Sequence, residues 1–240
     1  MITPIKKSTP YRLAVSTYRK TRLFTTKIKR KLTGTEGKII SSYTPKENKW
    51  KLHVGCGDHI LDDFINADLN PTSPRVLHLD ATKRFPFPDQ SFDYIFSEHM
   101  IEHIPYKDGI NMLSECHRIL RQGGRIRIST PDISFLAKLH QETSPLRQTY
   151  VKWSAETFLK EATPDDPTFV INNFFRDWGH QFIYSELTLR RSLENSGFIE
   201  ITKCKLNESL SPEFIGLENE SRMPEGFLEL ETMTFEATKS

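Results

Sequence analysis

The sequence predicts an α/β domain with a mostly parallel sheet and an antiparallel edge. Three observations support this fold class. Short apolar segments alternate with turns and a helical pattern between residues 50 and 130, several of these segments end in glycine or aspartate, and two late segments alternate between apolar and polar residues. Alternating strands and helices are typical of a parallel sheet, whereas a closing pair of strands suits an antiparallel edge.

The first five strands are expected at residues 51–54, 64–69, 76–79, 92–96 and 125–129. A turn at residues 87–90 precedes the fourth strand. Between the fourth and fifth strands, residues 109–120 repeat apolar side chains at helical spacing, and the pair Gly123-Gly124 is expected to end that helix.

The later part of the chain is less regular. Residues 133–180 are rich in aromatic side chains and are expected to be an irregular lid or substrate region. A helix is expected at 185–196, followed by strands at 198–205 and 227–237, the second of which is the final element. The predicted organisation is therefore a basic arm at 1–35, a linker at 36–48, and one domain at 49–240.

Charge is distributed unevenly along the chain. Residues 1–35 hold ten lysines and arginines and no acidic residue, while the rest of the chain has 23 basic and 31 acidic residues, a net charge of −8. Phe24, Ile28 and Leu32 recur every four residues within the arm, as on an amphipathic helix. A basic amphipathic helix suits an anionic membrane surface. A solvated tail is the alternative, and nucleic acid is disfavoured because the domain is acidic.

Composition excludes several classes of protein. No apolar run approaches the roughly 20 residues of a membrane-spanning helix, and the N-terminus lacks the apolar core of a signal peptide. The three cysteines, Cys56, Cys116 and Cys204, are far apart and odd in number. This pattern suits a reducing cytoplasm rather than a disulfide scaffold, and we expect a cytoplasmic protein, peripheral to the inner face of the membrane if the arm binds there.

Polar side chains or glycines follow three successive strands. Gly55-Cys56-Gly57 follows the first strand, Asp68 lies at the end of the second, and Asp80 at the end of the third. A glycine pair allows a tight turn and close approach of a ligand, and an acid after the next strand can accept hydrogen bonds from ribose hydroxyl groups. Each feature alone is a common turn, but their order favours a nucleoside site at the carboxyl ends of the strands.

The chain resembles the class I S-adenosylmethionine-dependent methyltransferases, and within them the type 11 methyltransferase domain group. The matching segments are LHVGCGDHILDDFINADLNP, LHLDATKRFPFPDQSFDYIFSEHMIEHI, ECHRILRQGGRIRISTPD and WGHQFIYSELTLRRSLENSGF. The resemblance implies a Rossmann-like sheet of seven strands whose last strand is antiparallel. It also implies S-adenosylmethionine as the cofactor and S-adenosylhomocysteine as the product.

The resemblance assigns cofactor-binding roles by position. Residues of the glycine loop would line the methionine part of the cofactor, Asp68 with Leu69 would hold the ribose, Asp80 and Ala81 would flank the adenine, and the residues after the fourth strand would lie near the sulfonium. The whole set is Gly55, Cys56, Gly57, Asp58, Asp68, Leu69, Asp80, Ala81, Ser97, Glu98 and His99.

Two positions depart from the pattern of that family. The usual glycine loop begins with an acidic residue and ends with a third glycine, where this chain has His53 and His59. The stretch from Gly57 to Asp68 is also short, which leaves little room for the usual first helix. We therefore expect the loop contacts at residues 58–60 to differ from those of the family.

Three histidines are candidate catalytic residues. His99 and His103 lie four residues apart, and His180 closes the segment Asp177-Trp178-Gly179-His180. An imidazole suits a general base if the acceptor is a hydroxyl group. The HxxxH spacing also invites a metal site, but the order of acids and histidines is wrong for HExxH, and no metal is expected.

The predicted function is transfer of a methyl group from S-adenosylmethionine to a small-molecule, lipid-linked or glycan acceptor. The apolar walls of its pocket are expected from Phe169, Phe174, Phe175 and Trp178. One alternative is an inactive cofactor-binding or scaffold protein of the same fold, which the changes at His53 and His59 would suit. Others are an RNA methyltransferase, and a nicotinamide-dependent oxidoreductase, although the longer GxGxxG loop of that class is missing.

Overall fold

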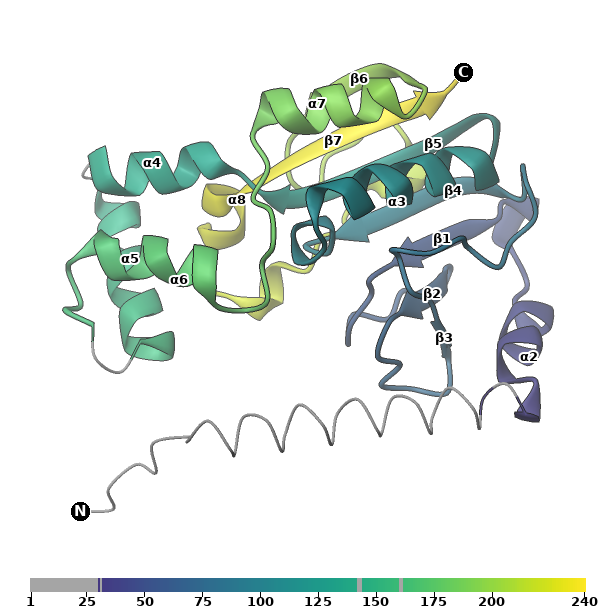
Figure 1. Cartoon of the computed structure of the whole chain (residues 1–240), viewed down its shortest axis with the longest axis horizontal. Coiled ribbons are helices and arrows are strands. Elements are labelled where there is room, and N and C mark those ends of the chain that lie inside the picture. The colour runs from purple at the N-terminus through teal and green to yellow at the C-terminus, as the bar shows by residue number, and fades with distance from the viewer. Residues whose placement is uncertain (1–29, 31, 142–143, 160–161) are drawn as a thin grey trace.

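The computed structural model describes residues 30, 32–141, 144–159 and 162–240. Most of the predicted basic arm, including Phe24 and Ile28, lies outside these residues. The described part is built around one sheet of seven strands in the order β3-β2-β1-β4-β5-β7-β6 (Figure 1). The strands are β1 (Lys51–Val54), β2 (Ile65–Asp68), β3 (Val76–His78), β4 (Phe92–Glu98), β5 (Leu120–Pro131), β6 (Phe198–Cys204) and β7 (Thr232–Lys239).

The pairing of the strands confirms the predicted fold class. Strands β1 to β5 pair with one another in parallel, and β7 is antiparallel to both β5 and β6. All four residues of β1 are buried, as expected for a central parallel strand covered on both faces. The carboxyl ends of β1, β2 and β4 therefore open at one edge of the sheet, where the predicted site lies.

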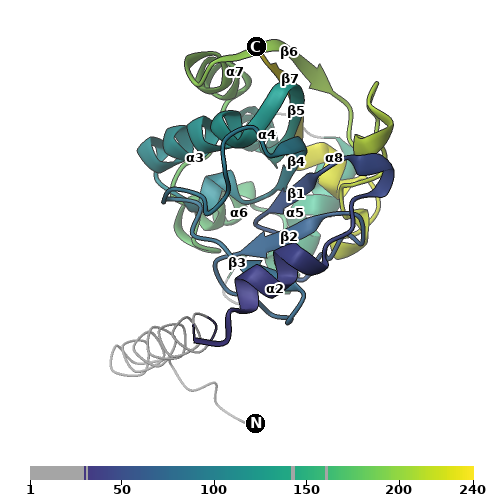
Figure 2. The same cartoon turned by 90° about the vertical axis from the view of Figure 1, so that its right-hand side faces the viewer.

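Two long helices cover one face of the sheet. Helix α3 (Tyr106–Ile119) and helix α7 (Glu186–Asn195) contact each other, and buried Leu113, Cys116 and Leu189 belong to the main core. The segment 205–226 lies on the other side of the sheet and is yellow-green in Figure 2. Among the described residues, no helix is long and apolar enough to cross a membrane.

The region expected to be irregular contains three helices. They are α4 (Ile133–Gln141), α5 (Pro145–Phe158) and α6 (Pro167–Arg176), and they gather beyond the carboxyl ends of β4 and β5 (Figure 1). Ser144 and Asp166 cap α5 and α6, each followed by proline in the first turn. The prediction was wrong here because serine or aspartate followed by proline is a turn signal that also begins helices.

Three further predictions need correction. The expected linker contains helix α2 (Thr35–Ser42), because Ile39 and Ile40 pack against the main core. The expected strand at 227–237 begins as helix α8 (Phe227–Glu231), in which Phe227 and Leu228 are buried, and becomes β7 only at Thr232. Gly123-Gly124 also lies within β5, after the helix has already ended at Ile119.

Candidate active site

The loop after β1 requires glycine at its first position. Gly55 has a φ of +75°, and a Cβ atom there would lie 2.1 Å from Cγ of Met100. The backbone nitrogens of Gly55 and Cys56 both donate to the carbonyl oxygen of Ala67, at 2.8 and 3.1 Å. Gly57 also has positive φ, but no described atom lies within 4 Å of its Cβ position. The loop is therefore tied to β2 on one side and open on the other.

The carboxylate of Asp68 links the loop after β1 to the loop after β2. One carboxylate oxygen accepts from the backbone nitrogen of Gly57 at 3.0 Å, and the other accepts from that of Asn70 at 2.7 Å. A carboxylate has about four lone-pair directions, so both oxygens retain accepting capacity for a ligand. The position predicted to bind ribose thus also shapes the glycine loop.

A pocket of about 310 Å³ opens at the glycine loop, and we call it the glycine-loop pocket. It contains six of the predicted cofactor residues together with both departures from the family pattern. Its lining is His53, Gly55, Cys56, Gly57, Asp58, His59, Glu98, His99, Asn219 and Arg222.

Five predicted cofactor residues do not line this pocket. Asp68 touches it through Gly57, while Leu69 is exposed and Ser97 is buried within β4. Asp80 accepts hydrogen bonds from the backbone nitrogen and hydroxyl group of Thr82, at 3.0 and 2.7 Å. It therefore closes a turn at the end of β3, and Ala81 packs at the edge of the core.

His53 occupies the place of the usual acidic residue as a buried, neutral imidazole. Burial lowers its pKa to about 3. Its Nδ1 lies 3.3 Å from Oδ1 of Asn66, whose amide nitrogen donates to the carbonyl oxygens of Leu61 and Phe64. Because that amide orientation leaves Oδ1 as an acceptor, Nδ1 of His53 must carry the hydrogen. Nε2 of His53 is then free to accept a hydrogen bond, as the carboxylate of the acidic residue that usually stands at this position would.

The C-terminal segment supplies site residues that the sequence did not predict. The backbone nitrogen of Asn219 donates to both oxygens of Glu98, at 3.1 and 3.3 Å. Arg222 follows in the 3-10 helix η4 (Glu220–Arg222), and its guanidinium lies 3.7 Å from Glu98. These residues lie more than 120 positions from β4 and have no motif, so only the fold brings them to the site.

A second pocket, of about 240 Å³, lies beside the first, and we call it the aromatic pocket. Phe174, Trp178 and His180 line it as predicted, whereas Phe169 and Phe175 are exposed and do not. The full lining is His99, Glu102, His103, Pro131, Tyr150, Trp153, Phe158, Phe174, Trp178, His180, Arg222, Met223 and Glu231. The two pockets share His99 and Arg222.

His99 lies between the two pockets in a strained backbone conformation. Its φ is +45°, which is unusual for a residue other than glycine and costs of order 1–3 kcal/mol. Nε2 lies 2.8 Å from the hydroxyl oxygen of Thr232, and burial holds the pKa of His99 well below its usual value. Strain of this kind is concentrated at functional sites.

The aromatic pocket contains two buried carboxyl groups. Burial raises the pKa of Glu102 to about 8 and that of Glu231 to about 7. Glu231 accepts a hydrogen bond from the hydroxyl group of Tyr150, and Oε2 of Glu102 accepts one from Thr130 at 3.0 Å. The pocket therefore combines apolar walls with titratable groups that are poised near neutral pH.

Comparison with known proteins agrees with this arrangement. Residues 61–128 match the family model described as "Methyltransferase domain". This match, over residues 61–128 of the chain, confirms the predicted resemblance to the type 11 methyltransferase domain group. The matched segment runs from the loop after the glycine turn to β5, and includes Asp68, Asp80 and the three residues after the fourth predicted strand. No curated protein sequence matches the chain.

Several solved structures are similar to the chain. A possible exported protein from Bordetella parapertussis superimposes with a TM-score of 0.50 at 12% identity, covering 86% of this chain and 66% of that one. A SAM-dependent methyltransferase from Archaeoglobus fulgidus gives 0.49 at 19% identity, covering 88% and 94%. Phosphoethanolamine N-methyltransferase 2 from Haemonchus contortus, in complex with S-adenosyl-L-methionine, gives 0.43 at 17% identity, covering 86% and 52%.

Proposed function

We propose that this chain transfers a methyl group from S-adenosylmethionine to a small-molecule acceptor that binds in the aromatic pocket. One observation carries the proposal: the glycine-loop pocket and the aromatic pocket meet at His99 and Arg222. Methyl transfer is an in-line displacement, so the donor and acceptor must approach each other from opposite sides of the methyl group. Two adjoining pockets supply that arrangement, and holding both reactants in line removes much of the entropic barrier.

The glycine-loop pocket is the cofactor side. The open backbone at Gly57 allows the methionine part of the cofactor to approach closely. Asp68 lies at the end of β2, where an acid accepts hydrogen bonds from ribose hydroxyl groups in related folds. Nε2 of His53 and the carboxylate of Glu98 supply further acceptors for the amino group of the cofactor.

The aromatic pocket is the acceptor side. Five aromatic side chains line it, which favours a small acceptor with an apolar or planar part over a bare glycan: Tyr150, Trp153, Phe158, Phe174 and Trp178. Burial lowers the pKa values of His99, His103 and His180, so these imidazoles are neutral near pH 7 and can accept a proton from an acceptor hydroxyl group.

The cofactor half of the proposal is tested by isothermal titration with S-adenosylhomocysteine. We expect saturable binding, weakened at least roughly tenfold by Asp68→Asn, because lost charged hydrogen bonds cost about 1.5–3 kcal/mol. Asp62→Asn is the matched control, since the Asp62 carboxylate is exposed and pairs with Arg75. No binding at high micromolar ligand would overturn the proposal, and equal weakening by both variants would remove Asp68 from the site.

A further inference from the structure

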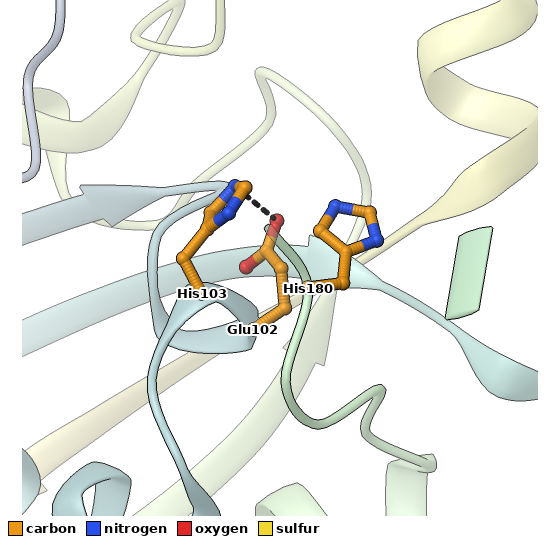
Figure 3. Close-up of side chains that lie close together, drawn as sticks. All are labelled: Glu102, His103 and His180. Carbon is orange, nitrogen blue, oxygen red and sulfur yellow. Dashed lines mark ion pairs between the residues drawn. The ribbon is translucent and has the colours of Figure 1, made fainter. Parts of the chain in front are cut away.

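Three potential ligand atoms converge on the wall of the aromatic pocket. They belong to Glu102 and His103 in the 3-10 helix η2 (Ile101–His103) and to His180, which precedes α7. One ligand atom from each residue lies within 4.8 Å of the other two. Figure 3 shows the Glu102 carboxylate between the two imidazole rings.

Glu102 provides a buried carboxylate oxygen that lacks a hydrogen-bond partner. Its side chain is fully buried, and Oε2 accepts from the hydroxyl group of Thr130. Oε1 has no hydrogen-bond partner among the described residues. Instead, Nδ1 of His99 lies 3.4 Å away and Nε2 of His103 lies 4.0 Å away. Leaving a buried acceptor unpaired costs about 1–3 kcal/mol, so a ligand that binds this oxygen would recover that free energy.

Ring nitrogens of the two histidines lie close to Glu102, and a hydrogen bond fixes the tautomer of His180. Nδ1 of His180 lies 2.8 Å from the carbonyl oxygen of Phe174, and that nitrogen must therefore be the donor. The carbonyl group of Phe174 therefore leaves Nε2 of His180 unprotonated, as in metal-binding histidines whose other ring nitrogen is held by a carbonyl group. Nδ1 of His103 lies 3.7 Å from the Cβ position of Gly179, and Nε2 of the same ring lies 4.0 Å from Oε1 of Glu102.

A cation between these three groups would satisfy the unpaired oxygen of Glu102 and accept the lone pairs of both imidazole rings. Arg222 lines the same pocket, but its ion pair is with Glu98 rather than Glu102. Calcium and magnesium prefer all-oxygen ligand sets, whereas imidazole nitrogen favours ions such as zinc, manganese or iron. We propose that Glu102, His103 and His180 bind a divalent transition-metal ion whose open positions face the aromatic pocket.

This site differs from the HxxxH pattern that the sequence suggested and from the expectation that no metal binds. Its ligands are the adjacent residues Glu102 and His103 together with His180. Between His103 and His180 the chain forms helix α3, strand β5 and helices α4 to α6. The positive φ angles of Trp178 and Gly179 turn the chain back toward η2. The role of the ion rests on the proposed function: its open positions would orient an acceptor oxygen toward His99 and the cofactor.

The test is metal binding to the full chain after treatment with EDTA and dialysis. Cobalt chloride and manganese chloride serve as probes. Bound Co²⁺ is measured by its visible absorption, and Mn²⁺ binding by the loss of the electron paramagnetic resonance signal of the free ion. We expect one ion per chain. His180→Gln and Glu102→Gln should each weaken binding by at least roughly tenfold, since even outer-shell partners of metal ligands cost about that much. His140→Gln, on the exposed side of α4, is the matched control.

Each result decides the question. Stoichiometric binding that both variants weaken, and that the control leaves unchanged, supports the site. Absence of binding at 100-fold excess metal, or binding that His180→Gln and His140→Gln affect equally, overturns it. Thermal melting shows whether Glu102→Gln folds, and His180→Gln at a half-exposed position provides a second variant if it does not. Titration of S-adenosylhomocysteine into the metal-free chain tests the proposed function separately.

Discussion

Arg127 and Glu218 form a two-pronged ion pair that is wholly buried beneath the candidate site. Nε and Nη2 of Arg127 donate to the two oxygens of Glu218 at 2.7 and 3.0 Å, and both side chains are inaccessible to solvent. Glu218 also accepts from Ser129 and from the backbone nitrogen of Asn207. Since Asn219 follows Glu218 directly, this pair anchors to β5 the segment that reaches the glycine-loop pocket.

Removing one partner of this pair should destabilise the fold strongly. In Glu218→Gln the Arg127 guanidinium keeps its ion pair with Glu236, 2.6 Å away, but loses its hydrogen bonds to the Glu218 carboxylate, and hydrogen bonds to charged groups contribute about 1.5–3 kcal/mol. We expect a loss of that order in the free energy of unfolding, measured by urea denaturation. The surface pair of Arg75 with Asp62 offers the comparison, because Arg75→Gln should change stability by less than about 1 kcal/mol. Similar losses in the two variants would show that Glu218 is not an anchor.

Alanine substitutions at Gly55 and Gly123 distinguish the cost of backbone strain from the cost of steric overlap. Their φ angles are +75° and +73°, but only at Gly55 would a Cβ atom collide with Met100. Gly123→Ala should therefore cost about 1–2 kcal/mol, the usual penalty of the left-handed region. Gly55→Ala should cost roughly 1–3 kcal/mol more from overpacking, and it should also weaken S-adenosylhomocysteine binding. Unfolding and titration measure the two effects, and equal costs would contradict the proposed close contact with Met100.

The central strands were predictable because their residues obey a local rule. β1 and β2 are short apolar segments followed by residues that end a strand, and their expected ranges differ from the observed ones by at most one residue at each end. The glycine loop follows β1 directly, so its position at the carboxyl edge of a parallel sheet also followed from the sequence. The cofactor side of the site was therefore accessible from local pattern and resemblance together.

The acceptor side was less accessible because it is assembled from distant parts of the chain. Arg222 and Glu231 have no surrounding motif, and long-range packing alone brings them beside His99. Helices α5 and α6 were not predicted because the residues that cap them, Ser144 and Asp166, are of types that also begin turns. Phe175 was expected in the pocket, but helical geometry places it on the outer face of α6 while Phe174 points inward.

The basic arm leads to a prediction that rests on sequence alone. Ten lysines and arginines within 35 residues should bind vesicles that contain anionic lipid, with each cation near the surface worth about 1 kcal/mol. Replacing Arg19, Lys20 and Arg22 with glutamine should weaken binding by roughly 100-fold in a sedimentation assay with phosphatidylserine vesicles.

The control for the arm is a change of equal charge on the domain, at exposed positions outside residues 1–35. Glutamine at Lys107, Lys152 and Arg191 should leave vesicle binding nearly unchanged. Binding to the anionic vesicles should fall with salt, whereas neutral vesicles should bind little. If both triple variants lose binding equally, the attraction comes from overall charge rather than from the arm.

His53 should make the stability of the protein depend on pH. Its pKa is about 3 in the folded chain because of burial, compared with about 6.5 when unfolded, so the unfolded chain takes up a proton first as the pH falls. The contribution to stability is complete above pH 6.5 and is lost progressively as the pH falls from 6.5 toward 3. At pH 5 the loss is about 2 kcal/mol, which is 1.5 pH units at about 1.4 kcal/mol each. Urea denaturation at pH 5 and pH 8 should show that His53→Gln loses about 2 kcal/mol less on acidification than the wild type does.

His140→Gln, at the surface, is the control and should follow the wild type. If the pH dependence of His53→Gln equals that of the wild type, His53 is protonated in the folded chain at pH 5. The contact with Asn66 would then no longer imply that Nε2 of His53 is a free acceptor.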